Sequence, residues 1–155
     1  MLVTQVARFA GLRISATCSA DKKDLVRSLG ASEVFDYRQT ALENLSHGFD
    51  VVVDCVGGET LKRCFAVVGR GGTLISLSRE PTDDEKSQRP DVRAIFFIVE
   101  PDGDELAEIA ELCNRGQIKT VIHGVYPLEK GAEAFEVLNE GHAKGKIVLK
   151  VAGGT

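Results

Sequence analysis

Short buried strands and amphipathic helices alternate along almost the whole chain, and this alternation restricts the folds that it can adopt. The run Asp50-Val51-Val52-Val53-Asp54-Cys55 is continuous and mostly β-branched, which is typical of a strand that helices cover on both faces. A helical stripe that ends at Gly69 follows it, and residues 73–77 form the next buried strand. Strand, helix and strand at short connections predict right-handed crossovers and a parallel sheet.

The same alternation continues on both sides of this segment. Helices should end at Gly11, Gly30, Gly116 and Gly141, and we expect Asp21 to cap one of them and Asp102 with Glu105 to form the capping box of another. Residues 79–91 are polar, contain two prolines and predict an exposed loop. The fold class is α/β, a Rossmann-like, doubly wound and mostly parallel sheet, whose further strands we expect over residues 13–18, 33–37, 92–99, 118–125 and 146–151.

Length and composition narrow the class of protein. A chain of 155 residues suits one domain, which we expect to span residues 1–155. Charged residues make up 27% of the chain and the formal net charge is -4, so no charge extreme points to nucleic acid as a partner. No apolar run reaches the roughly 20 residues of a membrane span and the start lacks a signal peptide, so we expect a cytoplasmic protein without a membrane partner.

The cysteines and histidines predict no metal site. The four cysteines lie far apart without a Cys-x-x-Cys pair, and each falls within or at the end of an apolar segment, which favours reduced core thiols: Cys18, Cys55, Cys64 and Cys113. The three histidines lack the spacing of metal ligands, and no Ser-His-acid grouping can be placed. We therefore assign no metal ligand and no catalytic acid or base.

Several stretches together resemble one protein family. They include residues 28–38 (SLGASEVFDYR), 52–58 (VVDCVGG) and 141–149 (GHAKGKIVL), with GGTLI at residues 71–75 and VYPLE at residues 125–129. Their order and separation resemble the zinc-independent, quinone oxidoreductase-like branch of the medium-chain dehydrogenase/reductases across almost the whole chain. The resemblance implies the C-terminal, zinc-binding-dehydrogenase-type Rossmann domain of that family, in which residues 118–155 resemble the segment that returns to the catalytic domain.

One part of the family pattern is missing. In the family, a first strand and an Ala-x-Gly-Gly-Val-Gly loop come immediately before a helix similar to residues 2–11, and this sequence has the helix without the strand or the loop. Such glycines let backbone N–H groups approach a pyrophosphate at the helix N-terminus. The resemblance therefore implies a truncated domain with weak or absent cofactor binding, unless the strand and loop exist upstream in nature.

The residues after the second strand of the family pattern predict the cofactor. An acidic side chain there holds the ribose 2′-OH of NAD, whereas the 2′-phosphate of NADP needs cations and hydroxyl groups. Ser19, Lys22 and Lys23 stand there and favour NADP(H), with Asp21 as a helix cap. The alternative is two solvated helix lysines. The resemblance adds Tyr37, which matches a position beside the adenosine phosphate. The alternative is that Tyr37 only packs against its own strand.

The carboxyl ends of the following strands supply the other candidate cofactor residues. Cys55, Val56 and Gly57 form a turn where open α/β sheets bind ligands, and its alternative is a plain strand-to-helix turn. Ser76 and Leu77 end the next strand at the same kind of edge. The resemblance adds Phe97, in a segment whose backbone meets the nicotinamide amide; the alternative is that Phe97 packs in the core. It also adds a basic group at Lys144 or Lys146 that reaches the cofactor; the alternative is a solvated turn.

Two functions of different class remain open. The resemblance implies an NADPH-dependent oxidoreductase that reduces a small quinone or enone, or an alcohol dehydrogenase-like enzyme, of which this chain is the cofactor-binding domain and by itself lacks the full active site. The alternative is a catalytically inactive, truncated Rossmann module that acts in dimerisation or protein interaction. An unpaired central strand edge favours homo-oligomers in either case.

Overall fold

The chain folds into two compact units in a computed structural model, which describes residues 1–45, 48–96, 98–141 and 143–151. One unit joins Met1–Phe35 to Asp102–Thr155, and the other is Asp36–Pro101. They are called the outer unit and the central unit below, after their places in the sequence. The single domain predicted over residues 1–155 stays a prediction, because it depends on how the two units associate.

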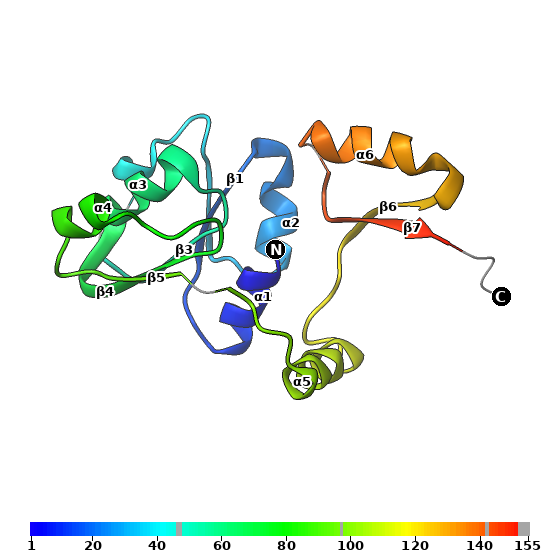
Figure 1. Ribbon diagram of the computed structural model, residues 1–155, viewed down its shortest axis with the longest axis horizontal. Coiled ribbons are helices and arrows are strands. Elements are labelled where there is room, and N and C mark those ends of the chain that lie inside the picture. The colour runs from blue at the N-terminus through cyan, green and yellow to red at the C-terminus, as the bar shows by residue number, and fades with distance from the viewer. Residues whose placement is uncertain (46–47, 97, 142, 152–155) are drawn as a thin grey trace. The chain divides into compact units, whose positions relative to one another are not determined.

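The central unit is a parallel three-stranded sheet with a helix packed on it (Figure 1). Its strands pair in the order β3 (Phe49–Asp54), β4 (Val68–Ser76) and β5 (Arg93–Phe96), and α3 (Gly58–Val67) contacts both β3 and β4. The core consists of the buried side chains of Leu61, Cys64, Phe65, Val68, Leu74 and Val92. The predicted β-branched run is β3, but the expected burial on both of its faces was wrong: Val51 is 50% exposed, and Val52 is the valine of this run that packs, partly buried, against the core cluster on α3.

A short helix, α4 (Asp83–Gln88), lies inside the stretch predicted to be a loop. Thr82 and Glu85 form a capping box, in which each side chain bonds the backbone N–H of the other residue. Three acidic residues in the first turn also suit the positive end of the helix dipole. The loop prediction was wrong because the two prolines flank a short capped helix, and the charged residues between them form that helix.

Glu85 makes the stability of this region depend on pH. Its buried carboxylate accepts two hydrogen bonds from Arg79, at 2.6 and 2.9 Å, and these lower the pKa of Glu85 to about 2. A lowered pKa in the folded state stabilises the fold above the ordinary value of 4.5 and loses that contribution as the pH falls toward 2.

We expect the stability difference between wild type and Glu85→Gln to be full at pH 7 and to shrink between pH 4.5 and 2. Urea denaturation at several pH values measures it, with Glu108→Gln on an exposed helix as the matched control. A difference that stays constant over this range would contradict the assigned Arg79 contact.

The outer unit contains two strand pairs and four helices among the described residues (Figure 1). β1 pairs with β2, β6 pairs in parallel with β7, and α6 packs on β6 and β7. Three short 3-10 turns occur along the chain, η1 (Ala20–Lys22), η2 (Leu42–Asn44) and η3 (Leu128–Lys130). The remaining bounds are α1 (Leu2–Phe9), β1 (Ser15–Cys18), α2 (Lys23–Ser28), β2 (Glu33–Asp36), α5 (Gly103–Asn114), β6 (Ile122–Pro127), α6 (Gly131–Asn139) and β7 (Lys146–Lys150).

The strand pairing has the form of a doubly wound sheet. The order 3-2-1-4-5-6 becomes a pair and a triplet when strand 1 is left out, and the structure shows the pair β1-β2 and the triplet β3-β4-β5. Both pairs in the triplet are parallel, as the short strand-helix connections predicted. The α/β, Rossmann-like fold class is confirmed.

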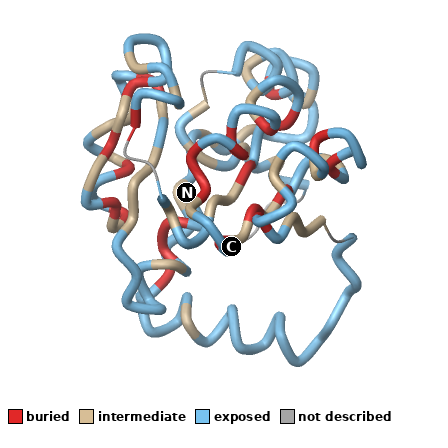
Figure 2. The backbone as a smooth tube through the Cα atoms, turned by 90° about the vertical axis from the view of Figure 1, so that its left-hand side faces the viewer, coloured by how far each residue is buried: buried red, intermediate tan, exposed pale blue. Residues whose placement is uncertain are grey.

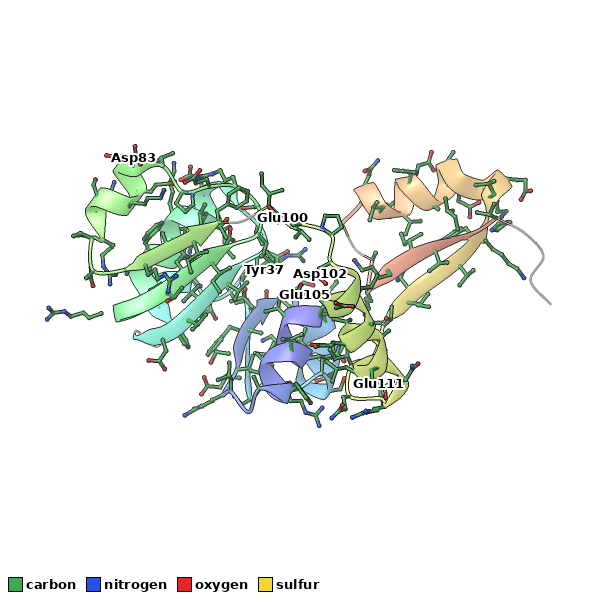
Figure 3. The ribbon with its side chains drawn as sticks, turned by 60° about the horizontal axis from the view of Figure 1, so that its bottom comes forward. Tyr37, Asp83, Glu100, Asp102, Glu105 and Glu111 are labelled. Atoms are coloured by element: carbon green, nitrogen blue, oxygen red, sulfur yellow. The ribbon has the colours of Figure 1, made fainter. Side chains whose placement is uncertain are left out.

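The helix α5 is well capped but little buried. The Asp102 carboxylate accepts the backbone N–H groups of Asp104 and Glu105, and Figure 3 shows Asp102 and Glu105 together at the start of the helix. Its apolar side chains are nevertheless exposed, Leu106 at 65% and Ile109 at 50%. In Figure 2 the helix along the bottom of the view is accordingly almost entirely pale blue. The apolar side chains predicted to share one face of this helix do lie on α5, but within the outer unit that face is not buried in a core.

Other local predictions need correction. Asp21 caps neither η1 nor α2 with its side chain. The strand predicted over residues 73–77 is longer at its start, because β4 begins at Val68 and passes through Gly71 and Gly72. None of the four cysteines is in a disulfide, but only Cys64 is buried, while Cys55 and Cys113 are exposed. No helix in the described ranges is long and apolar enough to cross a membrane.

Candidate functional site

The turn after β3 is organised by one buried carboxylate. Asp54, the last residue of β3, is 2% exposed. Its Oδ1 accepts the backbone N–H of Val56 at 3.1 Å, and its Oδ2 accepts the backbone N–H of Gly57 at 2.9 Å. These bonds fold the chain back at the carboxyl end of the strand and lead directly into α3, for which Gly57 is the N-cap.

A second hydroxyl-rich turn, after β4, joins the first. Ser78 Oγ donates to Asp54 Oδ2 at 3.2 Å, and the backbone N–H of Leu77 donates to the Asp54 carbonyl at 2.9 Å. The fully buried Ser76 lies 3.2 Å from Ser78, oxygen to oxygen, and accepts the backbone N–H of Arg79. The ends of β3 and β4 therefore form one hydrogen-bonded cluster, here called the Asp54 cluster: Asp54, Val56, Gly57, Ser76, Leu77 and Ser78.

Gly57 is required where the two turns meet. Its backbone has φ +80° and ψ -160°, a conformation that side-chain-bearing residues almost never adopt. A Cβ atom there would lie 2.6 Å from Ser78 Oγ and 2.9 Å from Ser78 Cβ. The absence of a side chain thus allows Ser78 to approach the Gly57 backbone closely, while the close approach of a ligand to this turn stays a prediction.

The outer side of the Asp54 cluster is open to solvent. Val56 is 74% exposed, Leu77 is 47% exposed, and Cys55 is also exposed. The N–H groups of Val56 and Gly57 already donate to Asp54, so a ligand at this turn would meet side chains and carbonyl oxygens. Such a surface suits hydroxyl or carboxamide donors better than a phosphate group.

Tyr37 and Phe97 complete the predicted residues near the central unit. Tyr37 directly follows β2, is 56% exposed, and has the Arg38 guanidinium 5.6 Å from its ring centroid. Its side chain therefore does not pack as an ordinary core residue. Phe97 lies outside the described residues. The binding roles of both stay predictions.

In the outer unit, the candidate cofactor residue Ser19 is hydrogen-bonded to the carboxylate of Asp21. Ser19 is 8% exposed and its Oγ donates to Asp21 Oδ1 at 2.6 Å. Lys144 Nζ lies 3.3 Å from Asp21 Oδ2 and donates to the Asp21 carbonyl at 3.1 Å. The hydrogen bond from Ser19, followed by the bond and charge of Lys144, lowers the pKa of Asp21. Asp21 is thus an ion-pair partner in place of the predicted helix cap.

The three remaining lysine predictions lie at the surface. Lys22 is half-buried in η1 and reaches the Gly141 carbonyl at 3.5 Å, and Lys23 begins α2. Lys146 is exposed at the start of β7, with its backbone N–H on the Val121 carbonyl. Within the outer unit, Ser19 and Lys144 therefore contact Asp21, whereas the Lys22 side chain reaches the Gly141 carbonyl and Lys146 lies at the start of β7.

Sequence reasoning missed the contacts that join these clusters. It named the turn after β3 but not the carboxylate of Asp54 as its organiser, and it did not predict the hydrogen bond from Ser78 to Asp54. The buried Asp at a strand end followed by two glycines was an available signal for Asp54. The pairing of Asp21 with Lys144 had no local signal, because 123 residues separate them.

No metal centre is found in the part of the chain that the structure describes. There, no three His, Cys, Asp or Glu side chains come together as ligands for an ion. Independence from zinc stays a prediction, because it concerns the whole protein. The buried Cys64 thiol has a pKa raised to about 12 by desolvation, which keeps it protonated and unreactive.

Comparison with known proteins places the chain among oxidoreductases. The sequence profile described as zinc-binding dehydrogenase matches residues 29–149. A probable zinc-binding oxidoreductase, mitochondrial, of Arthroderma benhamiae is 36% identical over 97% of this chain and 48% of its own length. An NADPH-dependent alkenal/one oxidoreductase, chloroplastic, of Arabidopsis thaliana is 33% identical over 96% of this chain and 36% of its own length.

Solved structures agree on the fold. The quinone oxidoreductase from Coxiella burnetii superposes with a TM-score of 0.90 at 24% identity, covering 97% of this chain and 49% of that protein. The CurK enoyl reductase superposes with a TM-score of 0.78 at 25% identity, covering 96% of this chain and 50% of that one. The chain therefore spans about half the length, or less, of the proteins it matches.

Proposed function

Because this chain belongs to the zinc-binding dehydrogenase family, in the quinone oxidoreductase-like part of the medium-chain dehydrogenase/reductases, we propose that it is the cofactor-binding part of an NADPH-dependent oxidoreductase. The proposed substrates are small quinones or enones. We assign the activity to a longer protein, of a length similar to that of the relatives, of which this chain is one part. One relative is named as an NADPH-dependent alkenal/one oxidoreductase, which supports this substrate class. A cytoplasmic location and a homo-oligomeric state are further predictions.

The Asp54 cluster is the observation that carries the proposal. It lies at the carboxyl ends of adjacent parallel strands, where open α/β sheets bind ligands. Gly57 permits close approach, and the exposed side chains of Val56 and Leu77 offer an apolar surface. We propose that the nicotinamide riboside end of the cofactor meets this turn, because its hydroxyl and carboxamide groups can donate to the carbonyl oxygens there.

The adenosine end is assigned to the segment after β1. Ser19 already donates its only hydroxyl proton to Asp21, so we expect Lys22 and Lys23, more than Ser19, to bind a 2′-phosphate. Tyr37 is proposed to lie beside the adenosine, as the family resemblance implies. The lysines act as point charges, and their contribution should fall as salt rises.

The chain's own residues bind and orient; when bound, the nicotinamide supplies the hydride that reduces the substrate. Such a reaction depends mainly on holding the two reacting atoms in line and close together. Asp54, through its hydrogen bonds to Val56 and Gly57, would keep the turn rigid enough for that task. No residue of this chain is assigned as a general acid.

Titration of the purified chain with NADPH and with NADH, followed by cofactor fluorescence, tests the proposal. We expect saturable binding that is tighter for NADPH, and Lys22→Ala should weaken NADPH binding roughly two- to fivefold with little effect on NADH. Lys130→Ala is the control, because Lys130, like Lys22, is the last residue of a 3-10 turn, but it lies in η3 and pairs with Glu133. Absence of saturable binding of either nucleotide would contradict the proposed function.

A further inference from the structure

Lys144 holds the only acidic side chain of the segment between Ser19 and Lys23. Asp21 has one carboxylate oxygen bound by Ser19 Oγ at 2.6 Å and the other paired with Lys144 Nζ at 3.3 Å. Lys144 also reaches the Asp21 carbonyl at 3.1 Å, so it contacts both the side chain and the backbone of the same residue. Both oxygens of the carboxylate are therefore occupied.

The position of Asp21 gives this pairing a consequence. It lies three residues after the end of β1, close to the place where a free carboxylate selects NAD by accepting the ribose hydroxyl groups. A free carboxylate at the same place would also repel a 2′-phosphate. The sequence thus contains an acid that opposes the NADP(H) preference which Lys22 and Lys23 favour.

We propose that Lys144 is a specificity-determining residue, which sets a preference for NADPH over NADH by binding Asp21 and so withdrawing its carboxylate from the ribose. This inference rests on the proposed function. With Asp21 paired to Lys144, the charges of Lys22 and Lys23 remain for the phosphate. Without Lys144, the Asp21 carboxylate keeps its bond from Ser19 but loses the cation at Oδ2, so its negative charge lies beside those two lysines without that ion pair.

The backbone around Lys144 holds it in place for this role. The Lys144 N–H donates to His123 Nδ1 at 3.2 Å, and the Lys146 N–H donates to the Val121 carbonyl at 2.8 Å. Between them, Gly145 has φ +129° and packs so closely on Val121 that a Cβ atom would collide with the Val121 carbonyl. The backbone of Lys144 and Lys146 is therefore bonded to β6 and to Val121 just before it, and this fixes the position from which the Lys144 side chain reaches Asp21.

A double-mutant cycle separates action through Asp21 from direct contact with the cofactor. Wild type, Lys144→Ala, Asp21→Asn and the double variant are titrated with NADPH and NADH, and the ratio of the two dissociation constants is compared. Lys144→Ala should reduce the preference for NADPH roughly three- to fivefold, as expected for an exposed ion pair. The effect should shrink in high salt.

The double variant gives the decisive comparison. If Lys144 acts through Asp21, removing it in the Asp21→Asn background should leave the preference unchanged, whereas a lysine that binds the phosphate directly would still weaken NADPH binding there. The latter result, or an unchanged ratio in Lys144→Ala, overturns the inference. If wild type binds neither NADPH nor NADH, the proposed function itself is contradicted and this inference loses its basis.

Discussion

Replacing Leu61 by alanine should lower the free energy of unfolding of the central unit by about 2–5 kcal/mol. Leu61 lies on α3, has no exposed surface, and belongs to the hydrophobic cluster that joins α3 to the sheet. The substitution removes the contacts of a buried side chain and leaves a cavity that Phe65 and Leu74 can fill only partly. Urea denaturation followed by circular dichroism measures the loss.

Leu106→Ala is the matched control for this prediction. It makes the same chemical change in a helix, but Leu106 on α5 is 65% exposed, so we expect a change of no more than about 0.5 kcal/mol. Equal effects of the two substitutions would contradict the assignment of the core to α3 and the sheet. A large effect of Leu106→Ala alone would mean that the exposed stripe of α5 is covered in solution.

Local patterns predicted the strands well because short runs of β-branched and apolar residues, bounded by polar residues and glycine, have a clear composition. The run predicted over residues 50–55 is β3 (Phe49–Asp54), and the strand predicted over residues 33–37 is β2 (Glu33–Asp36). The strand predicted from residue 118 begins only at Ile122, because apolar composition alone does not show where pairing with β7 starts. Helix α4 was missed although Thr82 and Glu85 matched a capping box, since its six residues carry no apolar stripe.

The candidate site was predictable only where the chemistry is local. The turn at Cys55, Val56 and Gly57 could be named because strand, glycine and helix follow one another in sequence. The bond between Asp54 and Ser78 depends on strand pairing across 24 residues, and the pair of Asp21 and Lys144 depends on the packing of segments from opposite ends of the chain. Neither has a periodicity or spacing that a sequence displays.

The pairing of Asp21 also changes the physical reading of the lysines. From sequence, Asp21 is a helix cap and Lys22 and Lys23 face a phosphate unopposed. In the structure, the acid is neutralised by a lysine that was itself a candidate cofactor residue. The electrostatic preference of this segment is therefore a property of three basic groups and one acid together, and substitution of any one of them changes the balance for the others.

Gly57→Ala should damage both stability and nucleotide binding. The backbone conformation at φ +80° and ψ -160° alone costs an alanine about 1–3 kcal/mol, and its Cβ would press on Ser78 as well. Relief of that contact would move the turn away from Ser78 or pull Ser78 from Asp54. We expect NADPH binding to weaken roughly tenfold, the equivalent of about 1.4 kcal/mol, in the fluorescence titration.

Gly58→Ala, one residue further on, separates the specific contact from general strain in the turn. Gly58 also has a positive φ, +55°, which an alanine tolerates at a cost of roughly 1–2 kcal/mol, but a Cβ atom there would meet open space. We therefore expect a loss of stability with unchanged nucleotide affinity. If Gly58→Ala weakens NADPH binding as much as Gly57→Ala, the effect comes from the flexibility of the turn, and close approach at Gly57 is not what binding requires. If neither substitution changes affinity while wild type binds NADPH, the dinucleotide does not meet the Asp54 cluster.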